Sequence, residues 1–190
     1  MSEDRTLADL LRDLPDGQPV TLGALLAATG ARSHGAALLL LSLPEALPLP
    51  VPSFGAILGV PLLVVSAHLA LFGQAGVLPR RLRGWKLPPM LTAALRGRVA
   101  DAVRWGEAIS RPRWLPLARM DRFLGLTCVC LSILLLVSLP LFNVPPALCL
   151  ALIAWGMLQR DGLAIAAGLG ATALILLILA GLADWFLALL

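Results

Sequence analysis

Two stretches of the chain, residues 35–73 and 123–157, are apolar for longer than an element of a soluble core requires, and prolines interrupt both. Each stretch is too long for one membrane crossing of about 20 residues and close to the length of two. The interruptions are residues 44–52 and 140–146. A proline inside a helix removes a backbone donor, and the carbonyl groups that it frees cannot be left facing lipid. Both interruptions must therefore be buried in protein, line a wet cavity or lie at the membrane surface.

The composition points the same way. Of the 190 residues, 59% are hydrophobic and 14% charged, and the mean hydropathy is +0.89, whereas soluble domains carry about a quarter charged residues. The pattern predicts an all-α, polytopic integral membrane protein. Residues 1–16 are charged and lack the apolar centre of a secretory signal peptide.

Positive charge is concentrated in one segment. Eleven of the 15 Lys and Arg residues lie between positions 80 and 122, against three acidic residues, so the local net charge is +8. The positive-inside rule places this segment in the cytoplasm. Binding to nucleic acid is the weaker explanation, because membrane flanks account for the charge and Trp85, Trp105 and Trp114 suit a lipid interface. We expect no nucleic-acid partner.

These features divide the chain into five parts. Thr21 is placed to cap the second of two short N-terminal helices, and residues 92–109 have the pattern of a basic amphipathic helix lying on a membrane surface. The predicted parts are a cytoplasmic or interfacial N-terminal region (1–34), a first proline-broken hairpin (35–77), a basic interfacial connector (78–122), a second proline-broken hairpin (123–161) and a C-terminal transmembrane helix (162–190).

Two questions about the hairpins stay open at this level. About eight apolar residues precede Pro44, roughly 12 Å of helix, so the first hairpin either re-enters the membrane or starts its helix earlier, near Gly30, and crosses. The segments 42–44 and 138–140 both read Ser-Leu-Pro, which indicates either an internal repeat or two similar membrane compositions. If the repeat is real, the paired broken helices are typical of transporters.

A set of short motifs in this order resembles the ExoD exopolysaccharide-synthesis family. The motifs are Thr21-Leu22-Gly23, Gly30-Ala31-Arg32-Ser33-His34-Gly35, Pro50-Val51-Pro52, Ile57-Leu58-Gly59-Val60-Pro61, Phe142-Asn143 and Gly156-Met157-Leu158-Gln159-Arg160-Asp161-Gly162. The resemblance covers roughly residues 7–182 and implies a multi-pass protein of the bacterial inner membrane, linked to exopolysaccharide production and tolerance of alkaline conditions. It implies no catalytic activity and supplies no catalytic residues. The chain has Pro145-Pro146 where the family usually reads Leu-Pro.

Four candidate sites follow from the residues themselves. Glu45 sits at the first break, where it is either a functional group at membrane depth or a solvated interfacial side chain. Asn143, at the second break, bonds freed carbonyls or contacts a solute. Arg32 with His34 forms an interfacial pair near headgroups or binds an anionic headgroup. His68 either packs between helices or couples protons. If the breaks converge, we expect Arg32, His34, Glu45 and Asn143 to share one polar cavity.

The remaining polar and small residues suggest structural roles. Cys128, Cys130 and Cys149 have no metal-ligand spacing and are interpreted as packing residues, so we expect no metal and no cofactor. Arg160 and Asp161, at a polar turn, suit a local ion pair or a helix cap. Small residues that allow helices to approach closely indicate a homodimer. They are Gly156, Gly162, Gly168, Gly170 and Ala171.

Three classes of function remain. The first is transport or handling of a lipid, such as a polyprenyl phosphate or another anionic amphiphile. The second is a non-catalytic membrane partner or scaffold of the polysaccharide machinery. The third, an enzyme acting on a lipid-linked sugar, is the least favoured, because no catalytic motif is present in the sequence.

Overall fold

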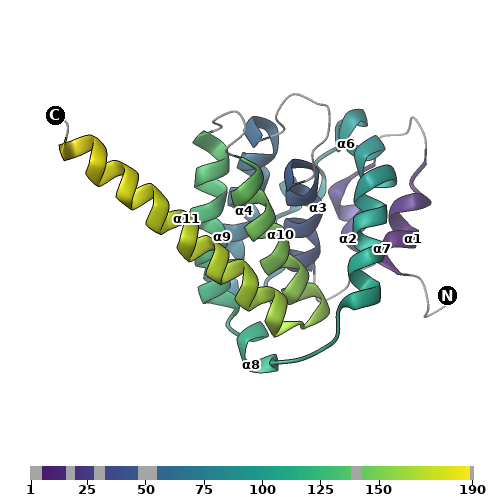
Figure 1. Cartoon of the computed structure of the whole chain (residues 1–190). Coiled ribbons are helices and arrows are strands. Elements are labelled where there is room, and N and C mark those ends of the chain that lie inside the picture. The colour runs from purple at the N-terminus through teal and green to yellow at the C-terminus, as the bar shows by residue number, and fades with distance from the viewer. Residues whose placement is uncertain (1–5, 16–19, 28–32, 47–54, 138–142, 189–190) are drawn as a thin grey trace.

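The computed structural model describes residues 6–15, 20–27, 33–46, 55–137 and 143–188, and these are almost entirely helical (Figure 1). No β-strand occurs among them, and only two isolated backbone bridges are present, Thr21 with Lys86 and Arg113 with Asp161. The prediction of an all-α fold is confirmed.

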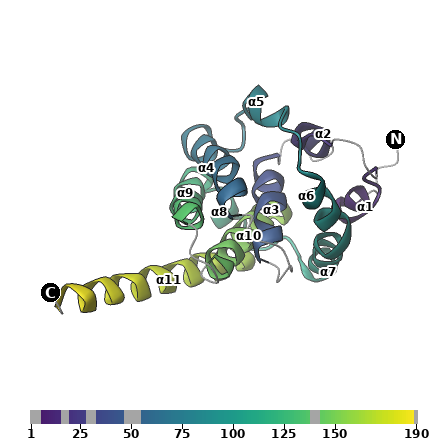
Figure 2. The ribbon, with the colours of Figure 1, turned by 90° about the horizontal axis from the view of Figure 1, so that it is seen from above.

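Four helices form a central bundle: α3 (Ser33–Ala46), α4 (Gly55–Phe72), α9 (Asp121–Val137) and α10 (Val144–Gln159). They come from the two apolar stretches, but each hairpin packs mainly against the other. Helix α4 lies along α9, and α3 lies along α10 (Figures 1 and 2). If the two apolar stretches are repeats related by a two-fold rotation, that rotation carries α3 onto α9 and α4 onto α10, and so exchanges the two packed pairs. The arrangement is compatible with the predicted internal repeat and does not distinguish it from convergent composition.

Helix α3 extends further than its prolines suggested. It begins at Ser33 and continues through Pro44 to Ala46, 14 residues in all, or about 21 Å of helix. Pro44 lies in the last turn, where the donor that it lacks would have served the Leu40 carbonyl, and the helix continues for only two residues beyond it. Nearby, the Ser42 hydroxyl donates to the Leu39 carbonyl at 3.3 Å. Residues 47–52 and 140–142 of the two predicted breaks, and Gly30, lie outside the described residues.

A second layer of short helices covers one side of α3. Helix α1 (Leu7–Arg12) has a capping box at Thr6, and α2 (Leu22–Ala27) begins after Thr21, whose hydroxyl accepts from the Ala24 amide at 3.3 Å. The predicted Thr21 cap is therefore present. Helix α1 packs with a kinked helical segment made of α6 (Pro89–Ala94), a π-helical turn η2 (Leu95–Val99) and α7 (Ala100–Ile109), whereas α2 packs with α3 and α5 (Arg80–Arg83). The kink lies at Gly97, whose dihedral angles are not helical.

This packing changes the interpretation of residues 92–109. Their apolar side chains Leu95, Val99 and Val103 are almost fully buried in the protein, against α1 and α3. We expected this apolar face to lie on a membrane surface. In the structure α1 covers the face in place of lipid. Sequence periodicity identified the apolar face but could not identify the surface that covers it.

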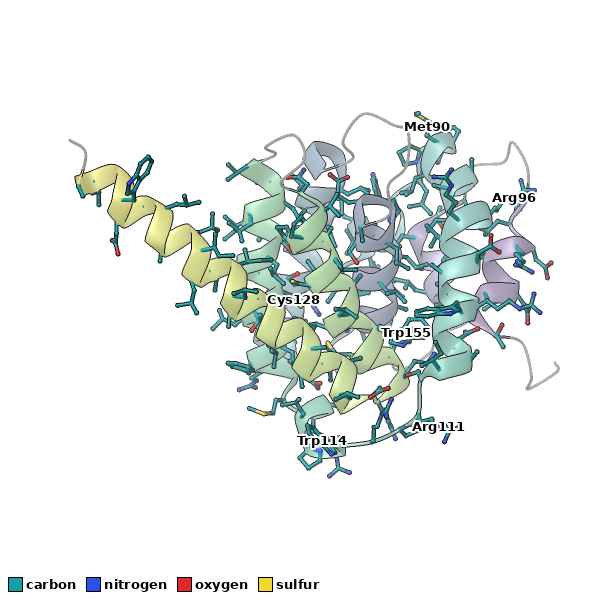
Figure 3. The ribbon with its side chains drawn as sticks, viewed as in Figure 1. Met90, Arg96, Arg111, Trp114, Cys128 and Trp155 are labelled. Atoms are coloured by element: carbon teal, nitrogen blue, oxygen red, sulfur yellow. The ribbon has the colours of Figure 1, made fainter. Side chains whose placement is uncertain are left out.

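Helix α7 also contacts α10. In Figure 3, Trp155 of α10 lies between α10 and α7, and a Cβ on Gly106 of α7 would come within 2.7 Å of its ring.

The opposite side of the bundle is apolar and open. Helices α4 and α9 expose a row of large hydrophobic side chains. Its members are Val60, Val64, Leu71, Phe72, Phe123, Leu126, Ile133, Leu136 and Val137. The long helix α11 (Gly162–Ala188) packs against α10 with its first half and then leaves the bundle (Figure 1).

Helix α11 is the one helix, among the described residues, that is long and apolar enough to cross a membrane. Its spanning window is Gly162–Trp185, with a hydropathy of 2.5 and 17% of the window buried. Helices α3, α4, α9 and α10 are shorter or less continuous, so the structure does not confirm that the protein is polytopic.

Candidate functional site

The two predicted breaks meet at a hydrogen bond between buried side chains. Glu45 is in the last turn of α3, and Asn143 immediately precedes α10. The Asn143 Nδ2 donates to Glu45 Oε1 at 3.0 Å, and the two residues are 9% and 5% exposed. Asn143 makes no side-chain cap to α10, so its amide is directed to the carboxylate. A buried carboxylate needs such partners, because burying it without them costs several kcal/mol.

The two histidines form a second polar contact, at the opposite end of α3. His34 Nε2 and His68 Nδ1 are 2.9 Å apart, and the rings stack with centroids 5.1 Å apart. His34 is fully buried, and its Nδ1 has no hydrogen-bond partner among the described residues. The ring of Phe72 lies against His68, with centroids 4.7 Å apart. An imidazole buried in this way is placed for contact between helices, and it is not placed to reach a lipid headgroup.

The expected single cavity is thus divided into two places. Helix α3 is continuous between His34 and Glu45, and eleven residues of helix separate them by roughly 16 Å. The structure brings Glu45 to Asn143 and His34 to His68, but it does not bring the two pairs together. Arg32, the fourth predicted member, lies outside the described residues. The prediction was conditional on the two breaks converging. They do meet, at Glu45 and Asn143, but His34 lies at the other end of α3.

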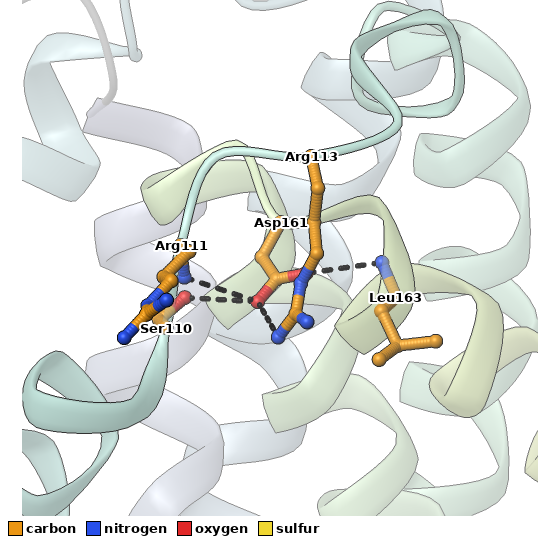
Figure 4. A network of polar contacts seen from close by, with 5 residues as sticks. All are labelled: Ser110, Arg111, Arg113, Asp161 and Leu163. Atoms are coloured by element: carbon orange, nitrogen blue, oxygen red, sulfur yellow. Dashed lines mark hydrogen bonds and ion pairs between the residues drawn. The ribbon is translucent and has the colours of Figure 1, made fainter.

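A third polar cluster surrounds Asp161, at the turn between α10 and α11 (Figure 4). Its carboxylate accepts from Arg113 Nε at 3.0 Å and from a second Arg113 nitrogen at 3.2 Å. It also accepts from the Ser110 hydroxyl at 3.2 Å, the Arg111 amide at 3.4 Å and the Leu163 amide at 3.1 Å. Asp161 therefore caps α11, as its position suggested, but its ion-pair partner is Arg113 and not Arg160.

The surroundings of Asp161 also set its charge. Burial by itself raises the pKa of the carboxyl group, but the hydrogen bonds from Arg113, Leu163 and Arg111 and the charge of Arg113 outweigh burial, and the pKa lies below its ordinary value. Asp161 is 3% exposed, and every one of its contacts joins the connector or α11 to the turn. The cluster is a structural joint between three parts of the chain.

An open pocket lies near the start of α3 that the sequence did not reveal. Its volume is about 350 Å³. It lies between α2, the start of α3, residues 74–78 and α5 (Arg80–Arg83). Its polar lining residues are Ser33, Gln74 and Arg83. The available signals were the turn at residues 73–76 and the dense positive charge that follows it, but neither indicates which elements close the pocket.

Metal binding has no support among the described residues. No group of three or more His, Cys, Asp or Glu side chains there could hold an ion. Cys128 and Cys149 are buried and Cys130 is partly buried, and all three are free thiols, which fits their interpretation as packing residues. Figure 3 places Cys128 within the bundle.

Together these features define a helical-bundle protein with one apolar, open side and an apolar helix of membrane-spanning length, which suggests a membrane protein. A family described as "Exopolysaccharide synthesis, ExoD" matches residues 4–181. The chain belongs to the ExoD family, as its motifs predicted.

Two relatives are similar to the chain over most of its length. The chain is 31% identical over 160 residues to the uncharacterized protein slr1875 of Synechocystis sp., covering 80% of this chain and 74% of the relative. It is 28% identical over 173 residues to Protein ExoD of Rhizobium meliloti, covering 86% of this chain and 72% of the relative. No solved structure matches the chain.

Proposed function

We propose that this protein is a multi-pass inner-membrane component of exopolysaccharide synthesis that handles a lipid or another anionic amphiphile. Membership of the ExoD family supports a role in exopolysaccharide synthesis. The observation that carries the finer proposal is the Glu45–Asn143 hydrogen bond. It places a buried carboxylate where both proline-interrupted stretches meet, and ionisable groups at membrane depth are functional candidates.

The open apolar side supports the membrane arrangement. The exposed side chains of α4 and α9 and the free half of α11 form a surface too apolar for water. We propose that this side faces lipid, and that the connector, with a local net charge of +8, lies on the cytoplasmic side. Single-cysteine labelling at Arg104, which is exposed, in a background without Cys128, Cys130 and Cys149, tests this topology. Labelling from the periplasmic side of intact cells contradicts it.

The test of the function compares two variants in cells that lack the native protein. Glu45→Gln removes the charge at nearly constant shape, and Asn143→Ala removes the donor. We expect both to lower exopolysaccharide output and growth at alkaline pH while the protein accumulates normally. Asp184→Asn, an exposed carboxylate on α11, is the matched control. Full complementation by both variants at neutral and alkaline pH contradicts lipid handling through this contact.

A non-catalytic partner of the polysaccharide machinery is the second candidate. The observation that favours it is the distal half of α11, where Leu177, Ile178 and Leu187 are exposed and available to another transmembrane helix. A second copy is the simplest such partner, so we also propose a homodimer. Three of the four glycines first assigned to that contact are used within the chain, whereas a Cβ on Gly170 would meet nothing within 4 Å. Cβ atoms on Gly156, Gly162 and Gly168 would approach other atoms of the same chain to 2.5–2.7 Å. Native mass spectrometry in lipid discs decides the state, and a monomer there contradicts the dimer.

A further inference from the structure

The open pocket beside the start of α3 has the lining of a binding site for an anionic amphiphile. It is formed where four parts of the chain come together: α2, the start of α3, residues 74–78 and α5. Figure 2 shows α5 at the edge of the molecule, beside α2. Its volume of about 350 Å³ falls in the range of small-molecule sites.

One wall of the pocket is a turn that hydrogen bonds hold in place. Helix α4 ends at Gly73, which has a positive φ of 66° and whose amide bonds to the Leu69 carbonyl at 2.8 Å. Only glycine adopts this conformation at low cost. The next residue, Gln74, is fixed by Asp121 of α9. Its backbone amide donates to the Asp121 carboxylate at 3.2 Å and its side-chain amide at 3.3 Å. No other described residue is hydrogen-bonded to the Gln74 side chain, so its oxygen and its second amide hydrogen can serve a ligand.

The facing wall is held by backbone hydrogen bonds. The Leu22 amide donates to the Trp85 carbonyl at 3.0 Å, and the Leu87 amide donates to the Val20 carbonyl at 2.9 Å. These bonds join α2 to the chain that follows α5. Gly23 permits the close approach, since a Cβ there would lie 2.8 Å from the Arg83 carbonyl oxygen. Arg83 therefore projects from a backbone that is fixed on both sides.

The charge of the lining is positive. Arg83 is exposed, and no hydrogen bond or ion pair joins its side chain to another described residue. None of the described residues that line the pocket is acidic. The carboxylate of Asp121, which holds Gln74, is already hydrogen-bonded to it. An unpaired guanidinium offers a planar fork of donors that matches phosphate and carboxylate oxygens.

The other lining residues are apolar, among them Leu26, Val77 and Leu78. A free inorganic ion would gain nothing from them, whereas the chain next to a charged headgroup would. Arg83, Gln74 and Ser33 provide three polar groups at one pocket, and a phosphate ester has several acceptor oxygens to engage them. We propose that this pocket binds the phosphate group of a lipid, with Arg83 as the main ligand to the phosphate.

This proposal is independent of the Glu45–Asn143 contact. The pocket lies at the opposite end of α3 from Glu45, so different variants test the two ideas. If the pocket does not bind lipid but the Glu45 variants lower exopolysaccharide output as expected, only the pocket proposal fails. If the pocket binds lipid but the Glu45 variants complement fully, only the proposal at the Glu45–Asn143 contact fails.

The charge test uses two neighbouring arginines in the purified full-length chain. Arg83 lines the pocket, whereas Arg81, in the same short helix, is exposed and does not line it. Phosphatidic acid, phosphatidylcholine and glycerol 3-phosphate are titrated in detergent and binding is measured by native mass spectrometry. We expect phosphatidic acid to bind at least tenfold more tightly than phosphatidylcholine. Arg83→Gln should lose about tenfold of that affinity, as expected for a charge-assisted hydrogen bond. Arg81→Gln should stay within about twofold of the unsubstituted protein.

The shape test uses two alanines of α2 and leaves the charge unchanged. Ala27 lines the pocket and Ala24 does not, and both are exposed. Ala27→Phe should block phosphatidic acid, and Ala24→Phe should not. The site is wrong if Arg83→Gln and Arg81→Gln lose equal affinity for phosphatidic acid. It is also wrong if Ala27→Phe binds phosphatidic acid fully and has an unchanged thermal midpoint. Glycerol 3-phosphate binding as tightly as phosphatidic acid overturns the lipid assignment and identifies a soluble phosphate ester as the ligand.

Discussion

Two buried carboxylates, Asp161 and Glu45, are held in very different ways. Asp161 accepts five hydrogen bonds, from Ser110, Arg111, Arg113 and Leu163, and shares an ion pair. Glu45 has one partner among the described residues, the amide of Asn143. Both side chains end in a carboxylate, so the difference between them comes from the residues that surround each one. A fully satisfied carboxylate stabilises a fold, and a sparsely satisfied one remains available for another role.

The largest expected effect comes from removing the first of these carboxylates. Asp161→Ala removes the α11 cap and leaves the Ser110 hydroxyl and the Arg113 guanidinium without their acceptor. Because Arg113 is partly exposed, we expect a loss of about 2–4 kcal/mol in the free energy of unfolding. Denaturant unfolding in detergent, followed by circular dichroism, measures it. Asp184→Ala, which removes an exposed carboxylate, is the control and should change stability by less than about 0.5 kcal/mol.

A smaller loss is expected at the second carboxylate. Asn143→Ala leaves Glu45 buried without its amide donor and should cost about 1–2 kcal/mol. Glu45→Gln should cost less than about 1 kcal/mol, because the glutamine oxygen can still accept from Asn143. The same unfolding measurement compares the two. If Glu45→Gln destabilises the protein as much as Asp161→Ala does, the contrast between a structural and an available carboxylate is wrong.

The comparison also predicts a pH dependence that belongs to Asp161. Its pKa in the folded protein is below the ordinary value of 3.8. The group therefore stabilises the fold fully at pH values above that ordinary value, and this contribution is lost as the pH falls towards the folded-state pKa. Unfolding of the native chain and of Asp161→Asn between pH 6 and pH 2 tests this. We expect the acid-induced loss of stability to be shallower in Asp161→Asn, and parallel curves would contradict the prediction.

The smallest effect should come from a single neutral donor to Asp161. Ser110→Ala removes one of its five hydrogen bonds and should lower the free energy of unfolding by roughly 0.5–1 kcal/mol. A larger loss would mean that the five bonds act cooperatively, which a double variant with Arg113→Ala can measure as a coupling energy.

Local features of the fold were predictable from the sequence. Thr21 and Asp161 were identified as caps because capping depends on neighbours a few residues away. The apolar face of residues 92–109 was identified from its spacing. Its partner was not, because the amphipathic pattern is the same whether α1 or lipid covers the face.

Contacts between distant residues were predictable only in part. The proximity of Glu45 to Asn143 was expected if the two breaks converged, and the structure brings them together. The contact of His34 with His68 was missed, because each histidine was interpreted alone and only the packing of α3 with α4 places them together. The pocket was missed for the same reason, since its walls come from four separate segments.

The crossed pairing of the hairpins has a consequence for biogenesis. Glu45 and Asn143 are 98 positions apart, and ribosomes add about 5–20 residues per second. For roughly 5–20 s, the first hairpin therefore exists without the helices that will cover it. During that interval the apolar sides of α3 and α4 need a temporary shelter, such as the insertion machinery or a chaperone. A nascent chain stalled before residue 121 should crosslink to such a factor, and release of the completed chain should end the contact.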